Sequence, residues 1–223
     1  PIQPDNAAGV LVDHLNDPGE RVQWDAHDIT RREAEAIGLA LHGKYCTHFS
    51  PQYSFAAVEL NLGALDIEVP EQGATVRIKG TLDGSRARFG ERGGVGITDL
   101  KSGKNAVTKP KGSERYVAAT KGHGFQVGVY EILYSRKLRK PITEPAEIIG
   151  LGTTPTTPIA RSTIANASGQ VLGRDATPEA PAAPSLIEIA AKYLRNDFFP
   201  PNPKSQVCSP KYCPRWSKCS YHE

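Results

Sequence analysis

The chain lacks any long hydrophobic run, and this absence limits the kinds of protein it can be. No apolar stretch approaches the roughly 20 residues that a membrane-spanning helix needs, and the first residues lack the basic and then apolar layout of a secretion signal. The sequence also lacks the G-x-x-x-x-G-K-[ST] motif of nucleotide-driven motors. We therefore expect a cytoplasmic protein that has no membrane partner and no nucleotide-driven motor of its own.

A strong charge imbalance is also missing. The 223 residues are 39% hydrophobic and carry a net charge of +3, which suits one ordinary domain and permits a nucleic-acid partner without requiring one. Basic residues do gather between residues 101 and 121, where a single acid, Glu114, stands among Lys101, Lys104, Lys109, Lys111, Arg115 and Lys121. This stretch is either a solvated loop or a surface that follows phosphates.

Hydrophobic periodicity predicts an α/β fold. Thr30 and Glu33 have the form of a capping box, and apolar residues then recur at helical spacing. Alternating runs, with a turn at residues 71–73, predict an antiparallel meander. The expected helices are 30–46, 125–138 and 185–194, and the expected strands are 55–62, 74–82, 95–100 and 146–151. Residues 1–29 are expected to be irregular or partly helical, and residues 152–184 to be a loop excursion, a hairpin or a surface loop, outside the core.

Two carboxylates and a lysine are expected on neighbouring strands. Asp83 follows the second strand, and Asp99 and Lys101 share a face of the third, because alternate strand residues point the same way. Carboxylates hold Mg²⁺ or Mn²⁺, and a lysine beside the ion can orient or deprotonate an attacking water. The alternative is structural, with Asp83 and Gly84 in a turn and Asp99 and Lys101 in a surface ion pair.

Four short motifs occur in a fixed order. They are Gly38 with His42 on the first helix, Gly80-x-x-Asp83, Asp99-x-Lys101, and Gln126-x-x-x-Tyr130 on the later helix. Together they resemble the RecB-like branch of the PD-(D/E)XK nuclease superfamily, which includes Cas4, the AddB nuclease domain and phage exonucleases. The resemblance implies a restriction-endonuclease-like core, a mixed central sheet flanked by helices, in a single nuclease domain over residues 1–203.

The resemblance also implies an activity. It points to a metal-dependent DNA exonuclease in recombination, repair or phage DNA processing, which acts on DNA ends with a helicase or recombinase partner. If the family's roles carry over to this chain, Asp83, Asp99 and His42 bind the metal. Gln126 and Tyr130 then position DNA and hold Lys101 in place. Alternatives are a Cas4-like CRISPR adaptation nuclease, a restriction-type endonuclease, and a catalytically silent DNA-binding or assembly module. A lone helical histidine such as His42 is otherwise often a surface residue.

Cysteine is scarce, and its distribution favours metal binding over disulfides. Of the four cysteines, Cys208, Cys213 and Cys219 have the spacing C-x4-C-x5-C near the end, and Cys46 lies far from them. We expect residues 204–223 to form a cysteine-rich module packed on the domain. The resemblance implies a [4Fe–4S] cluster, although Cys46 lies one helical turn after His42, unlike the family pattern. Alternatives are zinc, held by the late cysteines with His222 or Cys46, and uncoordinated thiols.

Overall fold

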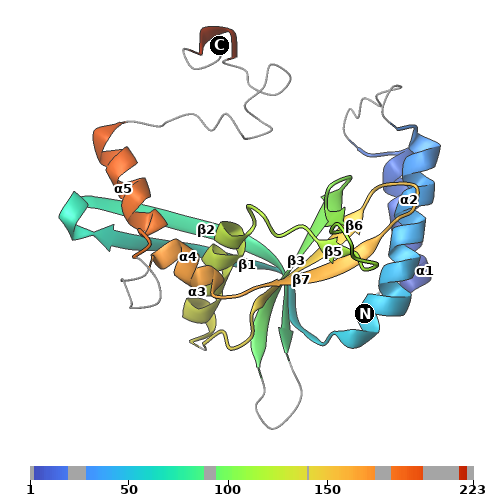
Figure 1. The fold of residues 1–223 in the computed structure, drawn as a ribbon, viewed down its shortest axis with the longest axis horizontal. Helices are drawn as coiled ribbons and strands as arrows, with labels where there is room; N and C mark the ends of the chain where they lie inside the picture. Colours follow the sequence, from blue (N-terminus) through green and yellow to red (C-terminus); the bar gives the residue numbers. More distant parts are fainter. Residues whose placement is uncertain are drawn as a thin grey trace.

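A mixed five-stranded sheet forms the centre of the computed structural model (Figure 1), which describes residues 3–19, 29–87, 94–139, 141–173, 182–197 and 216–219. The strand order is β1-β2-β3-β6-β7. Neighbouring strands are antiparallel except for β3 and β6, which are parallel. The strands are β1 (Phe55–Val69), β2 (Ala74–Ala87), β3 (Val95–Gly103), β6 (Ala146–Gly152) and β7 (Ile159–Ile164). The predicted α/β class, mixed sheet and antiparallel meander are confirmed.

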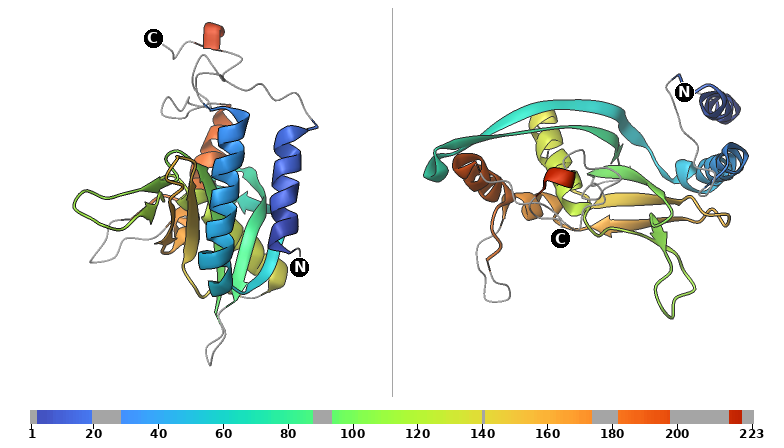
Figure 2. Two further views of the ribbon diagram at one scale, coloured as in Figure 1. Left: turned by 90° about the vertical axis from the view of Figure 1, so that its right-hand side faces the viewer. Right: turned by 90° about the horizontal axis from the view of Figure 1, so that it is seen from above.

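Helices flank the sheet at two places. The helices α3 (Gly124–Leu138), α4 (Ala167–Leu172) and α5 (Leu186–Asn196) lie near the curved arm formed by β1 and β2 (Figure 2). The helices α1 (Pro4–Asn16) and α2 (Arg31–Lys44) lie side by side at the opposite end of the molecule from α5. None of the described helices is long and apolar enough to cross a membrane.

The first predicted helix begins where its capping box indicates. The Thr30 hydroxyl accepts a hydrogen bond from the Glu33 backbone N–H (3.3 Å), and the Glu33 carboxylate accepts one from the Thr30 backbone N–H (2.9 Å). These bonds satisfy two donors that a helix start otherwise leaves without partners. After α2 the chain continues as a π-helical turn, Tyr45–Phe49, which contains Cys46.

The strands β1 and β2 are longer than their alternation predicted. The prediction ended β1 before Gly63, but the strand passes through this residue by a register shift between Asn61 and Ala64. Gly63 has a φ of +74°, which glycine adopts readily, and its backbone N–H donates to the Asn61 side chain (2.8 Å). A local bulge therefore joins two segments of β1, of which the sequence predicted only the first as a strand.

The expected loop excursion at 152–184 is wrong for most of its described part. Residues 159–164 form β7, the fifth strand of the sheet, and residues 167–172 form α4. Ala160, Ile164, Ala167 and Val171 are buried in the core. The Thr- and Pro-rich segment 153–158 precedes β7 and lowered the apolar content of the window, which hid two short core elements.

Close packing of α4 on α3 depends on Gly128. A β-carbon built at Gly128 would lie 2.3 Å from the Ala167 carbonyl oxygen and 2.7 Å from a Val171 methyl group. The two helices therefore approach at a distance that excludes any side chain there. Glu131, one turn further along α3, accepts a hydrogen bond from the Ser168 backbone N–H (2.8 Å) at the start of α4.

Gly128→Ala is expected to lower the free energy of unfolding by about 1–3 kcal/mol, because the new methyl group forces α3 and α4 apart. Gly43→Ala is the matched control: Gly43 also lies in a helix, but a β-carbon there would meet nothing within 4 Å. This control should gain roughly 0.5–1 kcal/mol from helix propensity. Urea unfolding of the two variants and the parent chain measures both changes, and equal effects would contradict this account of the packing.

Candidate active site

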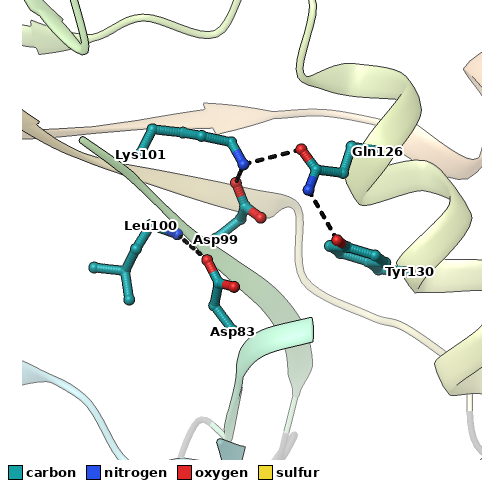
Figure 3. A network of polar contacts seen from close by, with 6 residues as sticks. All are labelled: Asp83, Asp99, Leu100, Lys101, Gln126 and Tyr130. Carbon is teal, nitrogen blue, oxygen red and sulfur yellow. Dashed lines mark hydrogen bonds and ion pairs between the residues drawn. The ribbon is translucent and has the colours of Figure 1, made fainter. Parts of the chain in front are cut away.

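The strands β2 and β3 diverge where the predicted acidic residues lie. Their backbones pair from Gly84 with Thr98 to Ala87 with Val95, and Asp83 and Asp99 are the next residues beyond this ladder. The Asp83 carboxylate accepts a hydrogen bond from the Leu100 backbone N–H (2.7 Å; Figure 3). A side chain thus replaces the missing strand partner, and it joins Asp83 to β3. The alternative in which Asp83 and Gly84 form a turn is wrong, because both residues lie within β2.

Asp99 is buried and paired with Lys101. Its side chain is 1% exposed, and the Lys101 ammonium lies 2.7 Å from Oδ2. Beyond this ion pair, neither carboxylate oxygen has a hydrogen-bond partner among the described residues. An ion pair at a protein surface would keep its oxygens hydrated, so the surface-pair alternative is wrong. A buried carboxylate without hydrogen bonds costs free energy unless another group compensates it.

The pKa of Asp99 follows from this environment. Burial raises the pKa of Asp99 above its usual value and outweighs the lowering by the Lys101 cation. The neighbouring Asp83 charge raises this pKa further. A buried carboxylate next to a second, partly buried carboxylate attracts a cation.

Gln126 and Tyr130 extend this network from α3. The Lys101 ammonium donates to Gln126 Oε1 (2.9 Å), and Gln126 Nε2 donates to the Tyr130 hydroxyl (2.8 Å; Figure 3). The two helical residues are four positions apart and therefore share one face. The structure thus brings together the predicted residues Asp83, Asp99, Lys101, Gln126 and Tyr130.

Gly80 makes room for Tyr130. A β-carbon at position 80 would lie 2.5 Å from Cε1 of the Tyr130 ring. The glycine of Gly80-x-x-Asp83 and the tyrosine of Gln126-x-x-x-Tyr130 are therefore one steric unit, although 50 residues separate them. This contact gives a physical reason for the two motifs to occur together.

His123 is a site residue that the sequence analysis missed. It precedes α3 and lies close enough to Lys101 and Asp99 to interact with both charges. Burial lowers the pKa of His123, the Lys101 cation lowers it further, and Asp99 opposes these effects. A sequence signal existed, since His123 is three positions before Gln126 and would share its helix face. The expected helix began at residue 125, which left His123 in a loop.

His42 does not join this group. Its ring Nε2 donates to the Pro4 carbonyl of α1 (2.9 Å) and lies 3.6 Å from the Cys46 sulfur. Within the part of the chain that the structure describes, no three His, Cys, Asp or Glu side chains are placed to hold a metal ion. The metal-binding role of His42 stays a prediction that this arrangement does not favour. Cys46 and Cys219 are half-buried free thiols, while Cys208, Cys213 and His222 lie outside the described residues.

A cavity of about 630 Å³ opens beside the network. Lys101 and His123 line it together with Lys104, Asn105 and Thr153. The site is therefore accessible from solvent on its lysine side, whereas Asp99 itself is buried. Basic side chains at the opening would attract a negatively charged ligand.

Comparisons with known proteins give only distant similarities. No protein-family model matches the sequence, and no curated protein is similar to it. Among solved structures, a protein from Eubacterium rectale described as a "putative exonuclease" is 15% identical, with a TM-score of 0.47 over 93% of this chain and 74% of that chain. SSO0001 is 17% identical, with a TM-score of 0.34 over 87% of this chain and 69% of that chain. Similarities at these values do not decide family or activity.

Divalent cations are expected to stabilise the fold through Asp99. Mn²⁺ at about 100 times its dissociation constant should add about 2.7 kcal/mol, which raises Tm by roughly 5–10 °C for a chain of this size. Asp99→Asn should abolish this rise. Acid should abolish it in the parent chain, because the raised pKa of Asp99 lets protons compete with the ion at a higher pH than at an ordinary aspartate.

Differential scanning fluorimetry at several pH values measures these shifts. Asp66→Asn is the matched control, because Asp66 is an exposed aspartate ion-paired with Arg77 (2.6 Å) on the distant arm. This control should keep the whole Mn²⁺ effect. A full Mn²⁺ effect in Asp99→Asn would show that the ion binds elsewhere.

The steric unit of Gly80 and Tyr130 predicts a coupled pair of substitutions. Gly80→Ala should cost about 1–3 kcal/mol of unfolding free energy, because the new methyl group displaces the tyrosine ring. In a Tyr130→Ala background the ring is absent, so the same substitution should cost much less. Chemical denaturation of the four chains in this cycle measures the coupling, and additive effects would refute the contact.

Proposed function

We propose that the chain is a metal-dependent deoxyribonuclease of the PD-(D/E)XK type, in the RecB-like branch, which hydrolyses phosphodiester bonds at DNA ends. The observation that carries this proposal is the buried Asp99 carboxylate, which has Lys101 as its ion-pair partner and Asp83 beside it. A buried Asp99 carboxylate without hydrogen-bond donors, next to a second carboxylate, is costly as a structural feature and useful as a cation site.

Asp83 and Asp99 would hold Mg²⁺ or Mn²⁺, since Mg²⁺ commonly binds to one or two carboxylates and completes its shell with water and substrate phosphates. When bound, the ion would activate water for attack and neutralise charge on the phosphate. The Asp99 oxygens, which have no hydrogen-bond partner among the described residues beyond the Lys101 ion pair, fit such a cation. His42 is not needed for a two-carboxylate site of this kind.

Lys101 has the position of a catalytic residue. Its ammonium contacts Asp99 (2.7 Å) and donates to Gln126 (2.9 Å), and its side chain lines the cavity. From there the ammonium can orient the attacking water and stabilise the negative charge that develops on the phosphate, whereas only its neutral amine form could take the proton from the water. Gln126 holds the lysine, and Tyr130 in turn holds Gln126, so both act as positioning residues.

Several finer proposals follow the family resemblance. A single nuclease domain would span residues 1–203, and a cysteine module at 204–223 would bind a [4Fe–4S] cluster, or zinc, through Cys46, Cys208, Cys213 and Cys219. The protein would serve recombination, repair or phage DNA processing with a helicase or recombinase partner, or CRISPR adaptation in a Cas4-like role. A catalytically silent DNA-binding module is less favoured, because Asp83, Asp99 and Lys101 are all present and adjacent.

The decisive experiment follows end-labelled linear DNA and closed circular DNA with Mg²⁺, Mn²⁺ or EDTA. Linear DNA should be degraded only with a divalent ion, and Lys101→Ala should reduce the rate at least about a hundredfold. Lys79→Ala is the matched control, because Lys79 is an exposed lysine on β2 outside the network, and it should keep the activity. Intact circles would indicate an exonuclease, and cut circles an endonuclease.

Two outcomes would refute the catalytic proposal. One is the absence of cleavage on every substrate by folded protein that carries its metal ions. The other is equal cleavage by the parent chain and Lys101→Ala, which would indicate a contaminating nuclease. Either result would leave a DNA-binding or assembly module as the better explanation.

A further inference from the structure

A second cavity continues from the one beside Lys101. It has a volume of about 470 Å³ and lies between α2 and the segment that joins β6 to β7. Ile29, Lys104 and Thr153 line both cavities, so the two spaces adjoin. Volumes of this order, roughly 300–1,000 Å³, are typical of small-molecule sites. We call this second cavity the α2 groove.

Small aliphatic side chains form the α2 side of the α2 groove, and the facing side combines Pro155 with three threonines. Ala36, Ile37 and Ala40 project from one face of α2, and Pro155 lies on the facing wall. Ala36 and Ala40 are exposed, whereas Leu41 on the same helix is buried. An apolar helix face left open next to a proposed catalytic lysine is suited to an apolar part of the substrate.

The facing wall of the α2 groove is fixed in place. The Lys44 ammonium donates to the carbonyl oxygens of Thr156 (3.0 Å) and Thr157 (2.8 Å) and to the Thr157 hydroxyl (2.6 Å). Thr157 has a φ of +43°, a conformation that L-residues rarely adopt and that this lysine clamp supports. These hydrogen bonds therefore fix the segment that carries Thr156 and Thr157 against α2.

Charge along the two cavities is graded. Lys101 and His123 line only the cavity beside the proposed active site, Lys104 lines both cavities, and Glu33 lines only the α2 groove. Phosphates would be attracted to the lysine end and repelled from Glu33. A nucleotide placed across the junction would thus have its phosphate near Lys101 and its base against Ala36, Ile37 and Ala40.

We propose that the α2 groove binds one unpaired base of a DNA strand, next to the phosphate that is cut. This inference rests on the proposed nuclease function and specifies its substrate as a single-stranded end. A base lying between the apolar face of α2 and the facing Thr and Pro wall cannot remain paired, as in enzymes that take a base out of the stack. The graded charge favours a nucleotide over an apolar peptide, which would gain nothing from the lysine end.

The test is a binding cycle that uses abasic DNA. Fluorescent single-stranded oligonucleotides, each with one abasic site at a different position, are titrated by anisotropy with Ca²⁺ in place of Mg²⁺. For the parent chain, removing the base at one position should weaken binding about tenfold, while removal elsewhere has little effect. Ala40→Phe fills the α2 groove and should bind intact DNA about tenfold more weakly, with no further loss from the abasic site.

Controls separate a filled groove from a damaged fold. Ala64→Phe places the same side chain at an exposed position of β1 outside both cavities, and it should bind as the parent chain does. Ala36→Phe is a second way to fill the α2 groove, and it should behave like Ala40→Phe. Circular dichroism and Tm establish that each variant is folded. Hydrolysis of bis(4-nitrophenyl) phosphate with Mn²⁺ reports on the catalytic residues without a base and should persist in both groove variants.

The outcomes distinguish this inference from the proposed function. Position-specific loss in the abasic scan without any DNA cleavage would support the base site and refute the nuclease. Cleavage by the parent chain with a flat abasic scan, or with intact binding in both groove variants, would overturn the base site. In that case a protein segment becomes the better occupant of the α2 groove.

Discussion

The burial of one negative charge governs the rest of this site. Asp99 lies on a strand of the central sheet, 1% exposed, with an ammonium group as its ion-pair partner. Burying an ion pair recovers little net free energy unless additional hydrogen bonds satisfy both partners. Here the lysine has such a bond, to Gln126, and the carboxylate has none among the described residues. The surrounding scaffold must therefore hold a carboxylate in a place that it would not occupy for stability alone.

The neighbouring elements each contribute to holding it. Asp83 caps the Leu100 backbone N–H where β2 leaves β3, so the strands separate without leaving a donor unsatisfied. Because Gly80 has no side chain, the Tyr130 ring fits against it. Tyr130 accepts a hydrogen bond from Gln126 and so keeps Gln126 directed at Lys101. The Gly80-x-x-Asp83, Asp99-x-Lys101 and Gln126-x-x-x-Tyr130 motifs thus form one network of side-chain contacts around Lys101. The sheet supplies rigidity, because β3 pairs with β6 along the whole segment from Thr98 to Gly103.

The sequence predicted the residues of this network, but it did not predict the neighbouring elements β7 and α4. Asp99 and Lys101 are two residues apart on a strand, so strand periodicity alone placed them together, and helical spacing did the same for Gln126 and Tyr130. Their mutual contact could be inferred only from the family resemblance, since no local rule joins β3 to α3. The core elements β7 and α4 were missed because the Thr- and Pro-rich segment 153–158 lowered the apolar content of the window, and because α4 packs on a helix distant in sequence. Ala167 against Gly128 is the clearest case, since the small residues that permit close packing have no hydrophobic period to detect.

Helix α2 has two faces with different contacts: one faces the α2 groove, and the other packs on α1 and carries His42. Ala36 and Ala40 face the groove, whereas His42 lies two residues beyond Ala40, roughly half a turn around the helix. That other face packs on α1, where Gly38 receives Leu11 and His42 binds the Pro4 carbonyl. Cys46 contacts the same histidine, so a metal ion or cluster at Cys46 would be built on the α1 side of α2. The described contacts of His42 therefore lie on the α1 side of α2, and its binding of a metal ion held by Asp83 and Asp99 stays a prediction.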